Sequence, residues 1–119
     1  MQDVADTRTD APVDLLAPAG AGPLWGIAAE DLNATLLAWP AGHEVAEHRN
    51  DELDVLVVVL AGDGTAVVDG REHALAAGTA LLVAKGSARL IRAGAGGVRY
   101  LSVHRRRALQ IQPLAAVAS

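Results

Sequence analysis

Cysteine and phenylalanine are both absent from this 119-residue chain, and its only aromatic side chains are Trp25, Trp39 and Tyr100. Without cysteine, no disulfide, iron–sulfur or thiolate–zinc chemistry is possible, which fits a reducing cytoplasm. The longest apolar run, residues 55–61, is too short to cross a bilayer. The first residues carry neither a basic start nor an apolar stretch, so we expect no signal peptide and no membrane partner.

A basic surface is also lacking, because the acidic residues outnumber the basic ones by 14 to 10 and the formal net charge is −4. A nucleic-acid-binding protein needs a basic face and usually stacking rings, so this class is excluded. The local run 105–107 is three arginines. It is more typical of a solvated strand end that keeps a sheet edge from pairing than of a phosphate site.

The length of the chain fits one domain, which follows a polar and then Ala-, Pro- and Gly-rich arm over residues 1–20. Within that arm, Asp10 and Pro12 are able to start one short helical turn that runs through Leu16. From residue 24 onward, short apolar segments alternate with turn signals and predict strands at 24–28, 32–39, 53–60, 65–69, 71–75, 79–84, 89–93 and 98–104. Many short antiparallel strands with no sustained helical period indicate an all-β sandwich or small barrel.

Glycine marks the expected turns between these segments. Asp69-Gly70 is the dipeptide that a tight hairpin favours, because both central residues need positive φ. Further turns are predicted at Asp63-Gly64, at Ala77-Gly78 and in the glycine-rich stretch 94–97.

Residues 55–60 carry large aliphatic side chains at both alternating positions, so both faces of this strand need cover. One face belongs to the barrel interior. The other needs the amino-terminal segment, a second sheet or a partner subunit, and on this ground we predict a homodimer.

Two glycine-framed motifs occur in order along the chain. In the first, Gly42 is followed by His48, Asn50, Val55 and Gly62, and in the second, the frame holds Gly78, Ala84, Lys85, Gly86, Arg89 and Ala93. These spacings resemble those of the small single-domain cupins. The resemblance implies an antiparallel jelly-roll barrel (double-stranded β-helix) over residues 21–112, between the loosely ordered arm 1–20 and a tail at 113–119.

The resemblance also identifies the positions that hold a divalent metal in many cupins, and here they are degenerate. His48 matches, whereas Asn50 replaces a second His, Val55 or Asp54 takes the position of a Glu, and Arg89 replaces the last His. An arginine stays protonated and has no lone pair to offer a metal. It would repel a divalent cation by roughly 8 kcal/mol for charges about 4 Å apart at an effective dielectric of about 20. We therefore favour no metal cofactor.

Polar side chains alternate at the start of the first motif, and an extended segment places such residues on one face. We expect His48, Asn50, Glu52 and Asp54 to rim the pocket, with a bulge or loop between Asn50 and Leu53 deciding which of them face inward. Arg89 then either forms an internal ion pair with Asp54 or Glu52, or holds a ligand carboxylate or phosphate.

Three functions remain open from the sequence. The first is a binding module for a small polar or anionic molecule, with a pocket formed by His48, Asn50, Arg89 and His104. The second is a divalent-metal enzyme (an oxygenase, isomerase or lyase) acting on a small acid or sugar-derived substrate. Its metal ligands would come from His48, Asp54, Glu52 and His104, with Glu52 as a possible general base. The third is a non-catalytic accessory or dimerisation module. Trp25 and Trp39 are more typical of core fillers than of a cavity lining.

Overall fold

A computed structural model of the chain describes residues 11–106, and this part consists of strands and loops without a helix. The strands are β1 (Gly22–Ala28), β2 (Leu32–Trp39), β3 (Glu44–Arg49), β4 (Val55–Val68), β5 (Arg71–Ala76), β6 (Ala80–Val83) and β7 (Ala88–Arg105). No helix long and apolar enough to cross a membrane occurs among these residues. The predicted boundaries at residues 112 and 113, and the start of the predicted helical turn at Asp10, lie outside the described residues.

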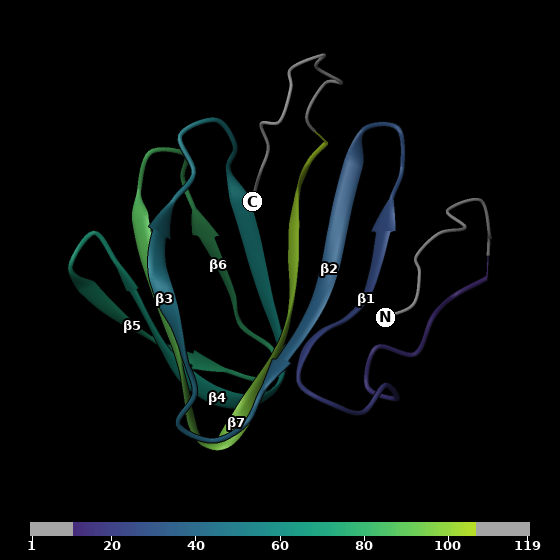
Figure 1. Ribbon diagram of the computed structural model, residues 1–119, viewed down its shortest axis with the longest axis horizontal. Helices are drawn as coiled ribbons and strands as arrows, with labels where there is room; N and C mark the ends of the chain where they lie inside the picture. The colour runs from purple at the N-terminus through teal and green to yellow at the C-terminus, as the bar shows by residue number, and fades with distance from the viewer. Residues whose placement is uncertain (1–10, 107–119) are drawn as a thin grey trace.

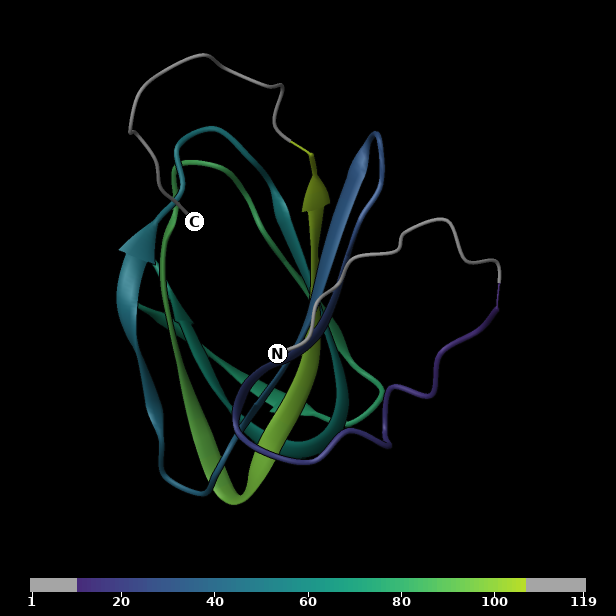
Figure 2. The ribbon, with the colours of Figure 1, turned by 45° about the vertical axis from the view of Figure 1, so that its right-hand side comes forward.

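All strand pairs are antiparallel, in the order β1-β2-β7-β4-β5, with β3 paired to β7 and β6 to β4. The long strand β7 serves both halves of the molecule. Its first half pairs with β3, its second half pairs with β2, and β4 follows it along both. Figures 1 and 2 show the two halves of β7 diverging from a bend at the lower end, so that β3 faces β1 and β2. The architecture is the antiparallel jelly roll that the motif frame predicts.

Two of the predicted turns are wrong, because the chain bends there without leaving the sheet. The segments 53–60 and 65–69 merge into β4, and 89–93 and 98–104 merge into β7. The pairing between β4 and β7 shifts register at Val59/Ala61 and again at Gly62/Gly64. Gly62 has a φ of +78°, and a Cβ on it would collide with the carbonyl oxygen of Gly97. Glycine therefore allows the two strands to approach closely while both bend.

The hairpin prediction is confirmed. Asp69 and Gly70 have φ values of +50° and +83°, and Val68 pairs with Arg71 on either side of them. The predicted helical turn through Leu16 contains no helix in its described part; residues 15 and 16 form a turn in which the Leu16 N–H donates to Oδ1 of Asp14 at 2.9 Å.

The core lies between the two halves of the jelly roll. It is built on Val55, Val57 and Val59, which are 3%, 1% and 1% exposed and share a cluster with Ile91, Ala93, Val98 and Tyr100, among others. The outer face of β2 and β7 is partly covered by the segment before β1. There, the guanidinium of Arg99 donates to the carbonyl oxygens of Leu15 and Pro18 at 3.1 and 2.8 Å.

Candidate functional site

A β-bulge in β3 brings the first two site residues together. Val45 pairs with Ile91 and His48 pairs with Arg89, so Ala46 and Glu47 together oppose the single residue between those partners on β7. An extra residue reverses the alternation of a strand, which places Val45 and His48 on the same side although they are three apart. The bulge lies before Asn50, and between Asn50 and Leu53, where the sequence predicted a bulge or loop, the chain forms a loop.

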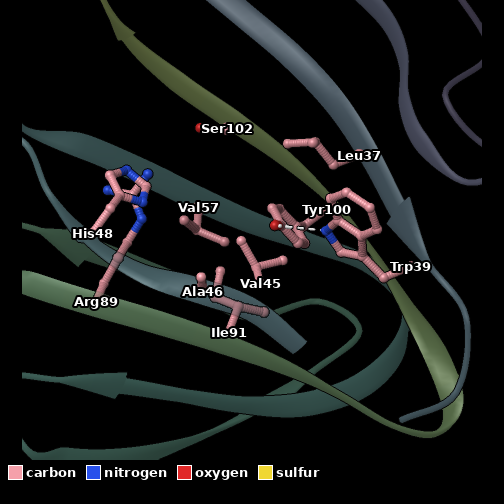
Figure 3. Close-up of a pocket in the computed structure, with 10 residues that line it drawn as sticks. All are labelled: Leu37, Trp39, Val45, Ala46, His48, Val57, Arg89, Ile91, Tyr100 and Ser102. Atoms are coloured by element: carbon pink, nitrogen blue, oxygen red, sulfur yellow. Dashed lines mark hydrogen bonds between the residues drawn. The ribbon is translucent and has the colours of Figure 1, made fainter. Parts of the chain in front are cut away.

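The inward side chains of four strands enclose a pocket of about 130 Å³. It is lined by Leu37 and Trp39 of β2, Val45, Ala46 and His48 of β3, Val57 of β4, and Arg89, Ile91, Tyr100 and Ser102 of β7. Figure 3 shows His48 and Arg89 at one end of this pocket and Trp39 with Tyr100 at the other. The aliphatic side chains of Val45, Val57 and Ile91 lie between the two ends.

Arg89 carries the charge of the pocket. Its Nη1 atom is buried and has no hydrogen-bond partner, and the guanidinium forms no ion pair within residues 11–106. Burial lowers the pKa of Arg89, and the neighbouring Tyr100 raises it. Because arginine starts from so high a value, the side chain remains a cation. The pocket thus contains a positive charge with an unused donor.

His48 lies beside this cation on the neighbouring strand and is exposed at the rim. Partial burial of its ring and, to a smaller extent, the charge of Arg89 hold the pKa of His48 below its ordinary value. Both causes disfavour a second positive charge, so the imidazole is neutral at pH 7. A neutral imidazole has one N–H donor and one acceptor nitrogen.

The opposite end of the pocket is aromatic and is held in place by hydrogen bonding and stacking. Trp39 Nε1 donates to the hydroxyl oxygen of Tyr100 at 3.1 Å, and the Trp39 ring stacks on His43 with centroids 4.4 Å apart. Burial raises the pKa of Tyr100, so its hydroxyl keeps its proton. The aromatic end is therefore uncharged.

Of the predicted ligand-binding residues, His48 and Arg89 line this pocket, whereas Asn50 and His104 do not. The amide oxygen of Asn50 accepts the N–H groups of Glu52 and Leu53 at 2.9 and 3.0 Å and shapes the loop between β3 and β4. The ring of His104 contacts the carbonyl oxygen of Arg105 at 2.9 Å.

The two carboxylates predicted from the sequence, Asp54 and Glu52, also lie outside the pocket lining. Asp54 accepts the N–H of Lys85 at 2.9 Å, and Glu52 lies exposed in the loop after β3. The predicted internal ion pair of Arg89 is therefore not formed, because the Asp54 carboxylate is bound to the backbone of the β6–β7 connection.

Sequence reasoning undervalued the aromatic end and the walls. Trp39 serves as both core filler and pocket lining, since it packs against the core cluster and borders the pocket. Tyr100 and Ser102 stand at alternate positions with His104 along β7, and that spacing was the available signal. The first two line the pocket, while the third is not part of the lining.

The donors present do not fit a resident divalent metal. Among residues 11–106, no cluster of three or more His, Asp or Glu side chains is arranged to hold a metal ion. His48 supplies the single imidazole among the described lining residues, and its neighbour is a cation rather than a carboxylate. The alternative ligand set of His48, Glu52, Asp54 and His104 is not brought together.

Comparisons with solved structures show similarity to cupins, whereas no family model and no curated protein matches the sequence. A cupin protein from Bacteroides fragilis is 18% identical with a TM-score of 0.67, and the match covers 99% of this chain and 93% of that one. A cupin superfamily protein from Desulfitobacterium hafniense DCB-2 is 20% identical with a TM-score of 0.69, covering 87% and 98% of the two chains. KdgF from Halomonas sp. is 18% identical with a TM-score of 0.65, covering 70% and 76%.

Proposed function

Because the chain has the fold of a small cupin, we propose that it is a binding module that holds a small anion against Arg89. The observation that supports this proposal is the buried Nη1 of Arg89, which has no hydrogen-bond partner among residues 11–106. An unpaired buried donor on a charged group is unfavourable, and the guanidinium fork matches a carboxylate or phosphate. A bound anion would supply both the missing acceptor and the missing countercharge.

His48 contributes to this function as a neutral donor at the rim. Its position opposite Arg89 places a second nitrogen beside any anion that the guanidinium holds. Anion binding would also offset the repulsion from Arg89 that lowers the pKa of His48. We therefore expect anion affinity to increase as the pH falls and His48 becomes protonated.

A matched pair of variants tests the role of Arg89. Arg89→Gln and Arg92→Gln each remove one positive charge from β7, but Arg92 is exposed on the outer side and pairs with Glu44 at 3.5 Å. Isothermal titration with acetate, butanoate and inorganic phosphate, at constant ionic strength, is expected to show binding that Arg89→Gln weakens at least tenfold and Arg92→Gln leaves unchanged. Equal weakening in both variants, or no binding of any anion, would refute the proposal.

The metal-enzyme alternative lacks a corresponding observation. Its site would need three or four donors around one point, and the described part of the chain places one imidazole and one guanidinium there. Thermal-shift measurements with Mn²⁺, Fe²⁺, Ni²⁺, Cu²⁺ and Zn²⁺ on protein without an affinity tag are expected to show no stabilisation that depends on His48. Stoichiometric metal that is lost in His48→Ala would favour the enzyme instead.

A further inference from the structure

Among the described residues that line the pocket, one side chain is charged and no second one matches it. That residue is Arg89 when His48 is neutral, and the other described lining residues are aliphatic, aromatic or hydroxyl-bearing. A ligand with two separated carboxylates would place one of them against apolar walls. Burying such a charge without a partner is strongly unfavourable. The charge pattern therefore selects a monoanion.

The walls between the two ends are apolar. Val57 and Ile91 belong to the core and are 1% and 4% exposed, while Leu37 and Val45 pack against that core. Figure 3 shows Val45, Val57 and Ile91 between the Arg89 end and the Tyr100 end, and Leu37 beside Tyr100 and Trp39. An alkyl group would be removed from water along this path, whereas a polar chain would lose its hydration there.

The orientation of the ligand follows from the burial of the two ends. His48 is exposed, whereas Tyr100 is only 4% exposed. A ligand whose charge rests on Arg89 thus has its head at the open end and its tail toward Trp39 and Tyr100.

The volume sets the size of the tail. The pocket measures about 130 Å³, and a cavity of about 150 Å³ accommodates one benzene molecule. A carboxylate head at the open end therefore leaves room for a tail of only a few carbons.

From these observations we infer that the ligand is a short-chain monocarboxylate, of about four to six carbons, bound tail-inward. This inference rests on the proposed anion-binding function and specifies its ligand class. The carboxylate pairs with Arg89, the alkyl tail lies along Leu37, Val45, Val57 and Ile91, and its end approaches the Trp39–Tyr100 pair.

A homologous series tests the tail. Isothermal titration of the full chain with acetate, propanoate, butanoate, pentanoate, hexanoate and octanoate is expected to show affinity that rises about fourfold per methylene, which corresponds to about 0.8 kcal/mol for each buried group. The gain should end once the pocket is full, so that octanoate binds no better than hexanoate. A series with no dependence on length would overturn the inference.

Diacids test the single charge. Succinate has the same chain length as butanoate but carries a second carboxylate, and we expect it to bind at least tenfold more weakly. Succinate or phosphate binding as tightly as butanoate, with the dependence on Arg89 retained, would overturn the monocarboxylate class and leave the anion-binding function standing. Absence of binding for every anion would remove both.

Two wall variants locate the tail. Leu37→Ala enlarges the pocket and is expected to shift the best ligand to a longer acid. Val45→Phe shortens the pocket and should abolish the increase in affinity from acetate to butanoate without changing the affinity for acetate. Leu82→Ala makes the same deletion as Leu37→Ala on an exposed side chain outside the pocket and is the control. Thermal unfolding confirms that each variant is folded. An unchanged length preference in both wall variants would contradict the assigned path.

Discussion

Arg89 connects binding with stability, because its guanidinium is partly buried, with Nη1 fully so, and lies beside a neutral histidine rather than a carboxylate. Without a bound anion, the charge of Arg89 has no countercharge among the described residues of the pocket. Replacement of such a charge by an apolar side chain of similar length is often neutral or stabilising. The same residue would then weaken the empty protein and strengthen the liganded one.

We therefore predict that Arg89→Met stabilises the ligand-free protein by about 1–2 kcal/mol while it abolishes anion binding. Urea denaturation without added anions measures the first effect and titration measures the second. Arg92→Met is the matched control, since its exposed pair with Glu44 contributes little and its loss should change stability by about 0.5 kcal/mol or less. Arg89→Met proving less stable than the control would contradict the unpaired state of Arg89.

His48 predicts a loss of stability in mild acid. The pKa of His48 is lowered in the folded protein, by burial first and by the charge of Arg89 second. Below about pH 6.5, His48 is therefore protonated in the unfolded chain while it is still neutral in the folded protein. Its contribution to stability is thus present above the unfolded pKa and is lost as the pH falls from there toward the folded pKa.

Titration of the His48 ring protons by NMR measures this shift directly. In Arg89→Gln, the pKa of His48 should rise toward its ordinary value without reaching it, because burial is the larger cause and remains. His48→Gln should flatten the pH dependence of stability in this window. A His48 pKa unchanged by Arg89→Gln would show that the two side chains do not interact.

The residues that matter most were accessible to sequence reasoning to different degrees. His48 and Arg89 were identifiable because glycine spacing fixed their places in the motif frame. Asn50 and Asp54 have equally suitable side chains, but backbone N–H groups capture both of them. Such local competition between backbone and ligand depends on loop geometry, which no spacing rule encodes.

At the scale of elements, strands with buried apolar residues were predictable from the sequence, and exposed polar strands were not. The segments β1 and β2 were predicted nearly as found, whereas β3 was missed because all but one of its residues are exposed and mostly polar. Its bulge was equally hidden, since an extra residue is visible only against the register of its partner strand. The glycines that break the hydrophobic pattern of β4 and β7 were interpreted as turns, although they permit bends within continuous strands.

Gly62 lies where β4 bends against β7, and this position should not tolerate a side chain. Gly62→Ala would place a Cβ against the carbonyl oxygen of Gly97 in addition to the unfavourable positive φ. We predict a destabilisation of about 3 kcal/mol or more. Gly70→Ala has a similar φ of +83° with no atom within 4 Å of the new Cβ, so it should cost only about 1–2 kcal/mol. Equal losses in thermal or urea denaturation would show that the close approach is unimportant.

At the scale of the whole molecule, the outer face of the sheet carries an exposed aliphatic patch around Leu56 and Leu82. Leu56 pairs with Leu82 across β4 and β6 and with Val103 across β4 and β7, and the two leucines are 39% and 59% exposed. The segment before β1 covers the part of this face near Arg99 and leaves the two leucines exposed. An uncharged aliphatic patch has no electrostatic feature that would select a different protein, and it suits a second copy of this chain in a two-fold contact.

We therefore propose that the protein is a homodimer in solution, as expected from the alternation in β4. Light scattering with size-exclusion chromatography should give twice the chain mass at micromolar concentration, and Leu82→Glu should give the monomer. Leu16→Glu introduces the same charge at a side chain 61% exposed outside the patch and should remain dimeric. A monomeric parent protein would refute this assembly.

The strand that carries His48 is joined to the sheet through one neighbour. Among the described strands, β3 pairs with β7, and its bulge interrupts that ladder, whereas β4 is paired with three others. Amide protons of β3 should therefore exchange with solvent well before those of the valine-rich core. Ligand dissociation and global unfolding would then have separate energy barriers. Substitutions in β3 could therefore change the residence time of a bound acid without changing the global unfolding rate of the barrel.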